Sequence, residues 1–334
     1  MQIGACIFGC SGKRLLGDER RFFEEVKPLG FILFDRNAGT LEEIGQLTQE
    51  LREAAGHNAL IMVDHEGGRV QRFRGSEWRN WLPALDQCGR VEPSLRARSM
   101  WLRYRIIASE LSAVGLNGNC VPLADVATDG THPVLRNRCY ATDSETVVSI
   151  ARSVAEGCMA GGIVPVLKHI PGHGGTTSDS HVETPINRSS FSELDDSEFK
   201  AFRALNDLPL GMTAHVVYEA LDASRPATMS PAVIEFIRSG IGFDGLLMTD
   251  DISMSALSAP LNERVSVALR AGCDAILHCN GDMMEMENVA QEAGALREAS
   301  NFRFRRAMDA AVKPVPADFH ALVDELAEIE GALP

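Results

Sequence analysis

The stretch Val164-Pro165-Val166-Leu167-Lys168-His169-Ile170-Pro171-Gly172-His173-Gly174 decides how the chain is expected to fold. It begins with a short apolar run, which is typical of a strand that is buried on both faces of a parallel sheet. Its glycines and Pro171 indicate a tight loop. Because the apolar run stops at Lys168 and His169, we predict a parallel strand whose carboxyl end carries polar side chains.

The same kind of apolar run recurs along the chain. Helical patterns separate the runs, and some of them open on helix-start signals: Thr40-Leu41-Glu42-Glu43 and Thr142-Asp143-Ser144-Glu145 fit the capping box, and Ser230-Pro231 places a cap before proline. The predicted strands are residues 4–8, 30–34, 60–63, 116–121, 164–167, 210–214, 245–248 and 275–277. This alternation predicts an α/β fold, a single (β/α)8 barrel of the TIM type.

Two further amphipathic segments, residues 283–298 and 317–329, follow the eighth predicted strand. We expect them to be C-terminal helices that close or cover the barrel. The sequence has no internal repeat, low-complexity tract or Pro/Gly/Ser linker that would mark a second domain. The expected organisation is therefore one barrel domain spanning residues 1–334, because barrels of this class often exceed about 250 residues.

Composition narrows the classes of partner. Apolar residues make up 45% and charged residues 23% of the chain, which is ordinary for a globular protein, and the net charge of −14 argues against nucleic acid and anionic membranes. No uncharged apolar stretch reaches the roughly 18 residues that a membrane span needs. The N-terminus reads as a strand and not as a signal peptide, and the cysteines form no CxxC pair. We expect a cytoplasmic protein with reduced cysteines.

Polar residues follow six of the predicted strands. They are Asp64-His65-Glu66, Asp125, Lys168-His169, His215, Thr249-Asp250-Asp251, and His278 with Asn280. Any one of these could be a solvated strand end, but the carboxyl ends of all barrel strands meet at one face, where barrel enzymes have their active sites. The sequence therefore predicts a shared polar site.

The loop from Lys168 to His181 has the most titratable groups. Asp179 and His181 can hydrogen-bond if the loop curls, and a carboxylate that orients an imidazole is a natural acid/base unit. The alternative is that these residues only fix a polar loop. Asp250 follows an apolar run directly and could act as nucleophile, base or metal ligand, whereas Asp251 suits a helix cap better. Asp64 could accept hydrogen bonds from vicinal hydroxyls, with donors from Arg72 or Lys168, and Arg138 lies in a loop expected to overhang the same face.

Taken together, these segments resemble the bacterial β-N-acetylglucosaminidases of glycoside hydrolase family 3. The resemblance runs in order through most of the chain. It rests on Phe34-Asp35-Arg36-Asn37, the stretch from Asp64 to Arg72, the stretch from Lys168 to Gly174 with Asp179-Ser180-His181, Thr213-Ala214-His215-Val216-Val217-Tyr218, and Gly242-Phe243-Asp244-Gly245 leading to Thr249-Asp250-Asp251-Ile252-Ser253-Met254.

The resemblance implies a retaining, exo-acting hydrolase that removes terminal β-linked N-acetylglucosamine from peptidoglycan fragments. These fragments carry 1,6-anhydro-N-acetylmuramic acid, with or without peptide, and are recycled in the cytoplasm. Asp250 would be the nucleophile, His181 the acid/base and Asp179 its partner. The sugar would be held by Asp64, Arg72, Arg138, Lys168 and His169. Two positions depart from the family pattern: His65, where Gln is common, and Arg136.

The resemblance implies no metal and no cofactor, a small saccharide or muropeptide as the only partner, and a monomer. A metal-dependent barrel hydrolase remains an alternative, because Asp64, His169, His173, His181 and Asp250 could form a His/carboxylate site. Phosphate could also replace water as acceptor, since a histidine acid/base repels it less than a carboxylate would. A sugar-binding sensor on an inactivated hydrolase fold is the third alternative, although the nucleophile and the acid/base pair are present.

Overall fold

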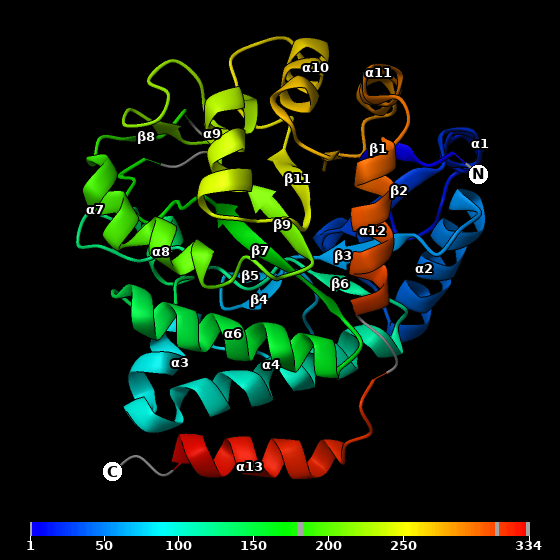
Figure 1. Cartoon of the computed structure of the whole chain (residues 1–334). Helices are drawn as coiled ribbons and strands as arrows, with labels where there is room; N and C mark the ends of the chain where they lie inside the picture. Colours follow the sequence, from blue (N-terminus) through cyan, green and yellow to red (C-terminus); the bar gives the residue numbers. More distant parts are fainter. Residues whose placement is uncertain (1, 179–182, 311–313, 332–334) are drawn as a thin grey trace.

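In the computed structural model, which describes residues 2–178, 183–310 and 314–331, eight parallel strands close into a barrel (Figure 1). In barrel order these strands are β1 (Gly4–Gly9), β2 (Pro28–Leu33), β3 (Leu60–Val63), β6 (Gly118–Asn119), β7 (Val164–Ile170), β9 (Leu210–Thr213), β11 (Leu246–Asp251) and β12 (Ala275–His278). Pairing of Cys6 with Ile276 joins the first strand to the last. The (β/α)8 fold expected from the sequence is confirmed.

Helices surround the barrel and shorter elements fill its loops. The outer helices are α1 (Gly17–Val26), α2 (Leu41–Ala55), α4 (Arg96–Ala113), α6 (Ser144–Ala160), α8 (Glu198–Arg203), α9 (Pro231–Glu235), α10 (Leu261–Ala271) and α11 (Met283–Ala293). The loops hold α3 (Ala84–Arg90), α5 (Pro133–Arg136), α7 (Phe191–Asp196), the antiparallel pair β4 (His65–Gly67) and β5 (Val70–Gln71), and the parallel pair β8 (Ile186–Asn187) and β10 (Val217–Tyr218).

Helix caps follow the sequence with one exception. Thr40 accepts from the backbone N–H of Glu43, and Ser230 caps α9 ahead of a proline, as predicted. The cap of α6 is Asp143 and not Thr142, because the Asp143 carboxylate accepts from the N–H of Thr146 at 2.8 Å. The capping box predicted at Thr142 is therefore wrong by one residue.

The barrel interior is a packed core and not a channel. Seven of the eight strands contribute side chains to this core, among them Ile7, Met62, Val166 and Leu246. At β6 the contribution comes from Cys120, the residue that follows the strand. At the amino-terminal end of the strands this core is completed by Phe304 and Ala307 of α12 (Glu298–Ala310). α12 is held there by ion pairs of Arg303 with Asp244 and Asp274. Among the described residues, α12 thus covers the amino-terminal end of the barrel, whereas the carboxyl end is open to a ligand.

Most predicted strands are shifted or differ in length by a few residues, and two predicted segments differ more. The segment 283–298 is not one helix, because α11 ends at Ala293 and the next residue, Gly294, has a φ of +60°, which lies outside the helical region. The chain then passes β1, where the Leu296 N–H bonds to Ile3 O, before α12 begins. The strand expected at 116–121 is shorter, since the N–H of Leu116 bonds back to Leu111 O at the end of α4. The last predicted helix is α13 (Phe319–Gly331), which packs along α4 (Figure 1).

Within the ranges that the structure describes, no helix is both long and apolar enough to cross a membrane.

Candidate active site

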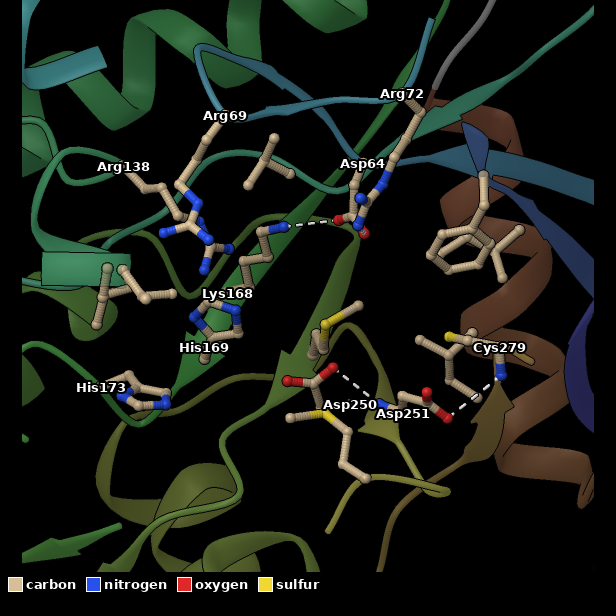
Figure 2. Close-up of a pocket in the computed structure, with 18 of the residues that line it drawn as sticks. Asp64, Arg69, Arg72, Arg138, Lys168, His169, His173, Asp250, Asp251 and Cys279 are labelled. Carbon is tan, nitrogen blue, oxygen red and sulfur yellow. Dashed lines mark hydrogen bonds and ion pairs between the residues drawn. The ribbon is translucent and has the colours of Figure 1, made fainter. Parts of the chain in front are cut away.

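A pocket of about 240 Å³ opens at the carboxyl ends of the barrel strands (Figure 2). Six of the residues predicted to bind or react with a ligand line it: Asp64, Arg72, Arg138, Lys168, His169 and Asp250. The other two, Asp179 and His181, lie outside the described residues. Apolar side chains that continue the barrel core form its floor, among them Ile32, Met212 and Leu277. The pocket lies at the carboxyl ends of the strands, where the sequence pattern predicts a shared polar site, and apolar side chains close its inner end.

Lys168 is the centre of a charged network in this pocket. Its Nζ lies 2.8 Å from Asp64 Oδ1 and 2.7 Å from Glu66 Oε1, and only 2% of its side chain is exposed. Arg138 binds the same Glu66 through two contacts, Nε to Oε2 at 2.9 Å and Nη2 to Oε1 at 2.8 Å. Arg72 approaches Asp64 Oδ2 at 3.3 Å. Buried charges are tolerated here because each has an opposite charge beside it.

The network fixes the charge state of its members. Burial alone would raise the pKa of Asp64, but Lys168 and Arg72 hold it well below the usual range. Burial would likewise lower the pKa of Lys168, yet the two carboxylates raise it above its ordinary value. At neutral pH the pocket therefore presents an ionised acceptor and fixed cationic donors. Such a set of groups suits the vicinal hydroxyls of a sugar, because each hydroxyl both donates and accepts.

A second buried group, Asp125, fixes the orientation of His169. Its Oδ2 lies 2.8 Å from His169 Nδ1, and its Oδ1 accepts from the backbone N–H of His173 at 2.8 Å. Because a carboxylate only accepts, Nδ1 of His169 carries the proton of this bond and Nε2 is left for the pocket. Burial and His169 lower the pKa of the neighbouring His173 to about 4, so His173 is neutral. Asp125 thus fixes the His169 side chain and the His173 backbone at the start of the long loop that follows β7.

The two adjacent aspartates at the end of β11 differ in their contacts. Asp250 accepts one hydrogen bond, from the Asp251 N–H to its Oδ1 at 2.8 Å, and its Oδ2 has no hydrogen-bond partner among the described residues (Figure 2). Burial would raise the pKa of Asp250, but His215 and His169 lower it, which keeps it ionised. Asp251 Oδ1 accepts from Ser253 and from the Cys279 N–H. Asp251 therefore ties two loops together and does not cap a helix, since the cap position of α10 is Pro260.

His215 supports this strand end from behind. Its Nε2 lies 2.9 Å from the carbonyl oxygen of Asp251 and its Nδ1 lies 2.7 Å from Thr228 Oγ1. A carbonyl oxygen only accepts, so Nε2 carries the proton and Nδ1 accepts from the hydroxyl. Burial lowers the pKa of His215, which favours this neutral form. Both ring nitrogens are used, and His215 holds the backbone that presents Asp250.

Three contributors were not among the residues that sequence reasoning assigned to the site. Glu66 bridges Lys168 and Arg138, Asp125 orients His169, and Arg69 lines the pocket. Asp125 and Glu66 were visible as polar strand ends, but nothing in the sequence tells which cation each of them meets. Arg69 belongs to the same motif as Arg72. Arg69 lies between β4 and β5, Arg72 follows β5, and both line the pocket.

The metal-dependent alternative gains no support from the described part of the chain. Within it, no group of three or more His, Cys, Asp or Glu side chains is placed to hold a metal ion. Asp64 and His169, two of the candidate ligands, are instead engaged by Lys168 and Asp125. Another of the five candidate ligands, His181, lies outside the described residues.

His65, one of the two departures from the family pattern, leads to a prediction for stability. Its ring is buried beside Phe73 and Trp78, and neither ring nitrogen has a hydrogen-bond partner among the described residues. Burial, with a smaller effect of Arg103, lowers its pKa from 6.5 to about 3. Between these two values the unfolded chain binds a proton that the folded chain does not, so stability falls as the pH falls below 6.5.

Replacing His65 by Leu should remove this dependence. At pH 5, proton binding by His65 in the unfolded chain lowers the free energy of unfolding by about 2 kcal/mol, and at pH 7.5 it lowers it by almost nothing. We therefore expect His65→Leu to gain about 2 kcal/mol more, relative to the parent, at pH 5 than at pH 7.5. The measurement is urea unfolding at both values. His320→Leu, on the exposed His320 of α13, is the control. Equal differences for His65→Leu at the two values would contradict the assignment.

The model of the family described as "Glycosyl hydrolase family 3 N terminal domain" matches residues 19–311. The β-hexosaminidase of Methylococcus capsulatus is 35% identical over 96% of this chain and 98% of its own length. The β-hexosaminidase of Alkalilimnicola ehrlichii is 37% identical over 84% of this chain and 82% of its own.

Two solved structures have closely similar folds. NagZ from Neisseria gonorrhoeae in complex with N-trifluoroacetyl-D-glucosamine has a TM-score of 0.86 at 28% identity, covering 99% of each chain. A family 3 β-N-acetylglucosaminidase from a Paenibacillus species has a TM-score of 0.86 at 26% identity, covering 98% of this chain and 67% of its own.

Proposed function

Because the chain belongs to glycoside hydrolase family 3 and is an enzyme, we propose that it is a retaining, exo-acting β-N-acetylglucosaminidase. Its substrate would be a terminal β-linked N-acetylglucosamine on 1,6-anhydro-N-acetylmuramic acid fragments of peptidoglycan, with or without peptide. One observation carries the proposal. One pocket contains both an ionised, partly free carboxylate, Asp250, and the charged network of Asp64 and Lys168. The names of the relatives support the choice of sugar.

In the proposed mechanism two displacements occur at the anomeric carbon. An Asp250 oxygen forms a bond to this carbon while the bond to the leaving oxygen breaks, and His181 gives that oxygen a proton. Water then attacks the glycosyl-aspartate, His181 takes a proton from the water, and the carboxylate of Asp250 is released. The sum is hydrolysis with the β configuration kept. Asp179 would orient His181, and Asp64, Arg72, Arg138, Lys168 and His169 would hold the sugar.

The enzyme is proposed to act as a monomer with a single barrel domain in the cytoplasm and without metal or cofactor. All eight cysteines are free thiols, which fits a reducing compartment, and seven of them are buried.

Release of nitrophenol from 4-nitrophenyl β-N-acetylglucosaminide, with a chelator present, tests the function. We expect turnover at least about 100-fold faster than for the corresponding β-glucoside, together with a first product of β configuration by NMR. A first product of α configuration would refute the retaining mechanism. Loss of turnover on addition of the chelator would favour the metal-dependent alternative. Formation of a glycosyl phosphate in phosphate buffer would favour phosphorolysis. Sugar binding without turnover would favour a sensor.

The position of Arg69 favours a substrate whose leaving group carries a negative charge. Figure 2 shows its guanidinium directed into the pocket beside that of Arg138. Arg138 donates two hydrogen bonds to the carboxylate of Glu66. Arg69, in contrast, is exposed, and its side chain makes no hydrogen bond or ion pair within the described ranges. A guanidinium without a carboxylate at the pocket rim can bind the carboxylate of a muramic acid or of its peptide.

Replacing Arg69 by Gln should therefore separate two kinds of substrate. For a fragment that carries a carboxylate on the leaving side we expect kcat/KM to fall about 10-fold, the worth of one charge-assisted hydrogen bond. For the neutral nitrophenyl glycoside the change should stay within about 3-fold. Arg74→Gln is the control, because Arg74 is an exposed arginine just after β5 that does not line the pocket. Equal losses on both substrates would remove Arg69 from the leaving-group subsite.

A further inference from the structure

The glycine-rich start of the loop after β7, residues 172–176, is held by side chains from separate parts of the chain. Tyr218 of β10 donates its hydroxyl to the Gly172 carbonyl, and Thr131 donates its own to the Gly174 carbonyl. The backbone N–H of His132 donates to the Thr176 carbonyl at 3.1 Å. We call residues 172–176 the loop stem. The stem ends three residues before Asp179, at the start of the segment that carries the proposed acid/base pair.

Glycine is required in the stem because its neighbours leave no room for a side chain. A Cβ on Gly172 would lie 2.7 Å from Glu198 Cβ and 2.8 Å from Glu198 Oε2, and Gly172 has a φ of +142°. A Cβ on Gly174 would lie 1.9 Å from the carbonyl oxygen of Val126. The stem is therefore packed directly between the Val126 backbone and the first residue of α8, and its path is set by both.

Glu198 makes the central contact beneath the stem. Its Oε1 accepts from the Gly175 N–H at 2.9 Å, and Asn187 Nδ2 lies 3.4 Å from its Oε2. The side chain is buried, and no Lys, Arg or His nitrogen of the described residues is within ion-pair distance of it. Burial raises the pKa of Glu198 to about 8, so this carboxyl is kept in place at a cost to stability. A leucine would fill the same space at a smaller cost to stability, but it could not accept a hydrogen bond from the Gly175 N–H.

We propose that Glu198 is a positioning residue, which acts through the loop stem to align the acid/base pair with the leaving oxygen. The inference rests on the proposed function, because it takes His181 as the proton donor. Glu198 lines a separate cavity of about 200 Å³ behind the stem and is not among the residues that line the active-site pocket. Its effect on the reaction therefore passes through the Gly175 N–H and not through contact with the sugar.

Two nearly isosteric substitutions test this. Glu198→Gln keeps an acceptor for the Gly175 N–H, whereas Glu198→Met keeps the volume and removes the acceptor. With aryl β-N-acetylglucosaminides of increasing leaving-group pKa, we expect Glu198→Gln to stay within about 3-fold of the parent throughout. Glu198→Met should lose roughly 30-fold in kcat/KM on the poorest leaving group and less than about 3-fold on the best, because a misplaced acid matters only when the departing oxygen needs its proton.

A purely structural role would change all substrates alike. Equal losses for Glu198→Met on good and poor leaving groups, or a Gln variant as slow as the Met variant, would overturn the proposal. Glu193→Gln is the control, since Glu193 lines the same cavity but caps α7 and does not contact the stem. If Glu198→Met does not fold, Thr131→Val removes another stem contact and should give the same dependence on leaving group. If Thr131→Val shows no dependence on the leaving group, the proposal is overturned as well.

His181→Ala, measured in the same series, separates this inference from the proposed function. If His181→Ala shows no dependence on leaving group, the acid/base assignment falls, and the Glu198 inference falls with it. If His181→Ala shows the dependence and Glu198→Met does not, only the Glu198 inference falls. The double variant should be no slower than His181→Ala on the poorest leaving group, because Glu198 has nothing left to position.

Discussion

Replacing Asp250 by Ala is expected to lower kcat/KM for aryl β-N-acetylglucosaminides by about 10⁴-fold or more, because no glycosyl-enzyme can form without the nucleophile. The carboxylate is ionised, since His215 and His169 hold its pKa down against burial. Added azide should restore turnover in the Ala variant by attacking the face that Asp250 has left. The product is then the α-glycosyl azide, with the configuration inverted.

Asp251→Asn is the matched control for this experiment. Its carboxylate accepts from the backbone N–H groups of Ser253 and Cys279, so the substitution should cost stability but leave double displacement in place. Azide should not change the product of this variant. Undiminished activity of Asp250→Ala, or azide rescue of Asp251→Asn in its place, would reassign the nucleophile.

The second large effect is expected for His181→Ala. A general acid contributes about 10²–10⁴-fold when the leaving group needs a proton and little when it does not. We expect kcat/KM for a disaccharide substrate to fall about 10³-fold and that for the 2,4-dinitrophenyl glycoside to fall less than about 10-fold. Azide can also enter this variant, but it attacks the glycosyl-enzyme, so the product is the β-glycosyl azide.

The two azide products make the assignments independent of each other. An α-azide from His181→Ala, or equal losses on both leaving groups, would contradict the acid/base role. His132→Gln is the control, because His132 lines the same pocket and belongs to the loop that contacts the stem. It should not show a comparable dependence on leaving group.

The barrel and the position of the site could be predicted from the sequence because both depend on local patterns. Each apolar run forms a strand at or near its predicted place, and the polar residue that follows it, such as Asp64 or Asp250, lies at the carboxyl end. Parallel pairing then brings these ends together regardless of what lies between them.

The pairing of charges could not be predicted, because it depends on contacts between distant segments. Glu66 reaches Lys168 and Arg138 across the barrel mouth, and Asp125 reaches His169 from the neighbouring strand end. The sequence shows that these groups are polar, but it does not show which carboxylate meets which cation. For the same reason Asp251 was interpreted as a helix cap, since its actual partner, the Cys279 N–H, lies 28 positions further along the chain.

The closure of the barrel has a consequence for synthesis of the chain. β1 pairs with β12, as in Cys6 with Ile276, and Phe304 of α12 completes the interior core, so β1 waits for partners that are synthesised about 270 positions later. Until then β1 has an unpaired edge and the interior side chains lack their cover, a state that is prone to association. The acidic excess of the chain, −14 overall, keeps such incomplete chains apart by mutual repulsion while they are being made.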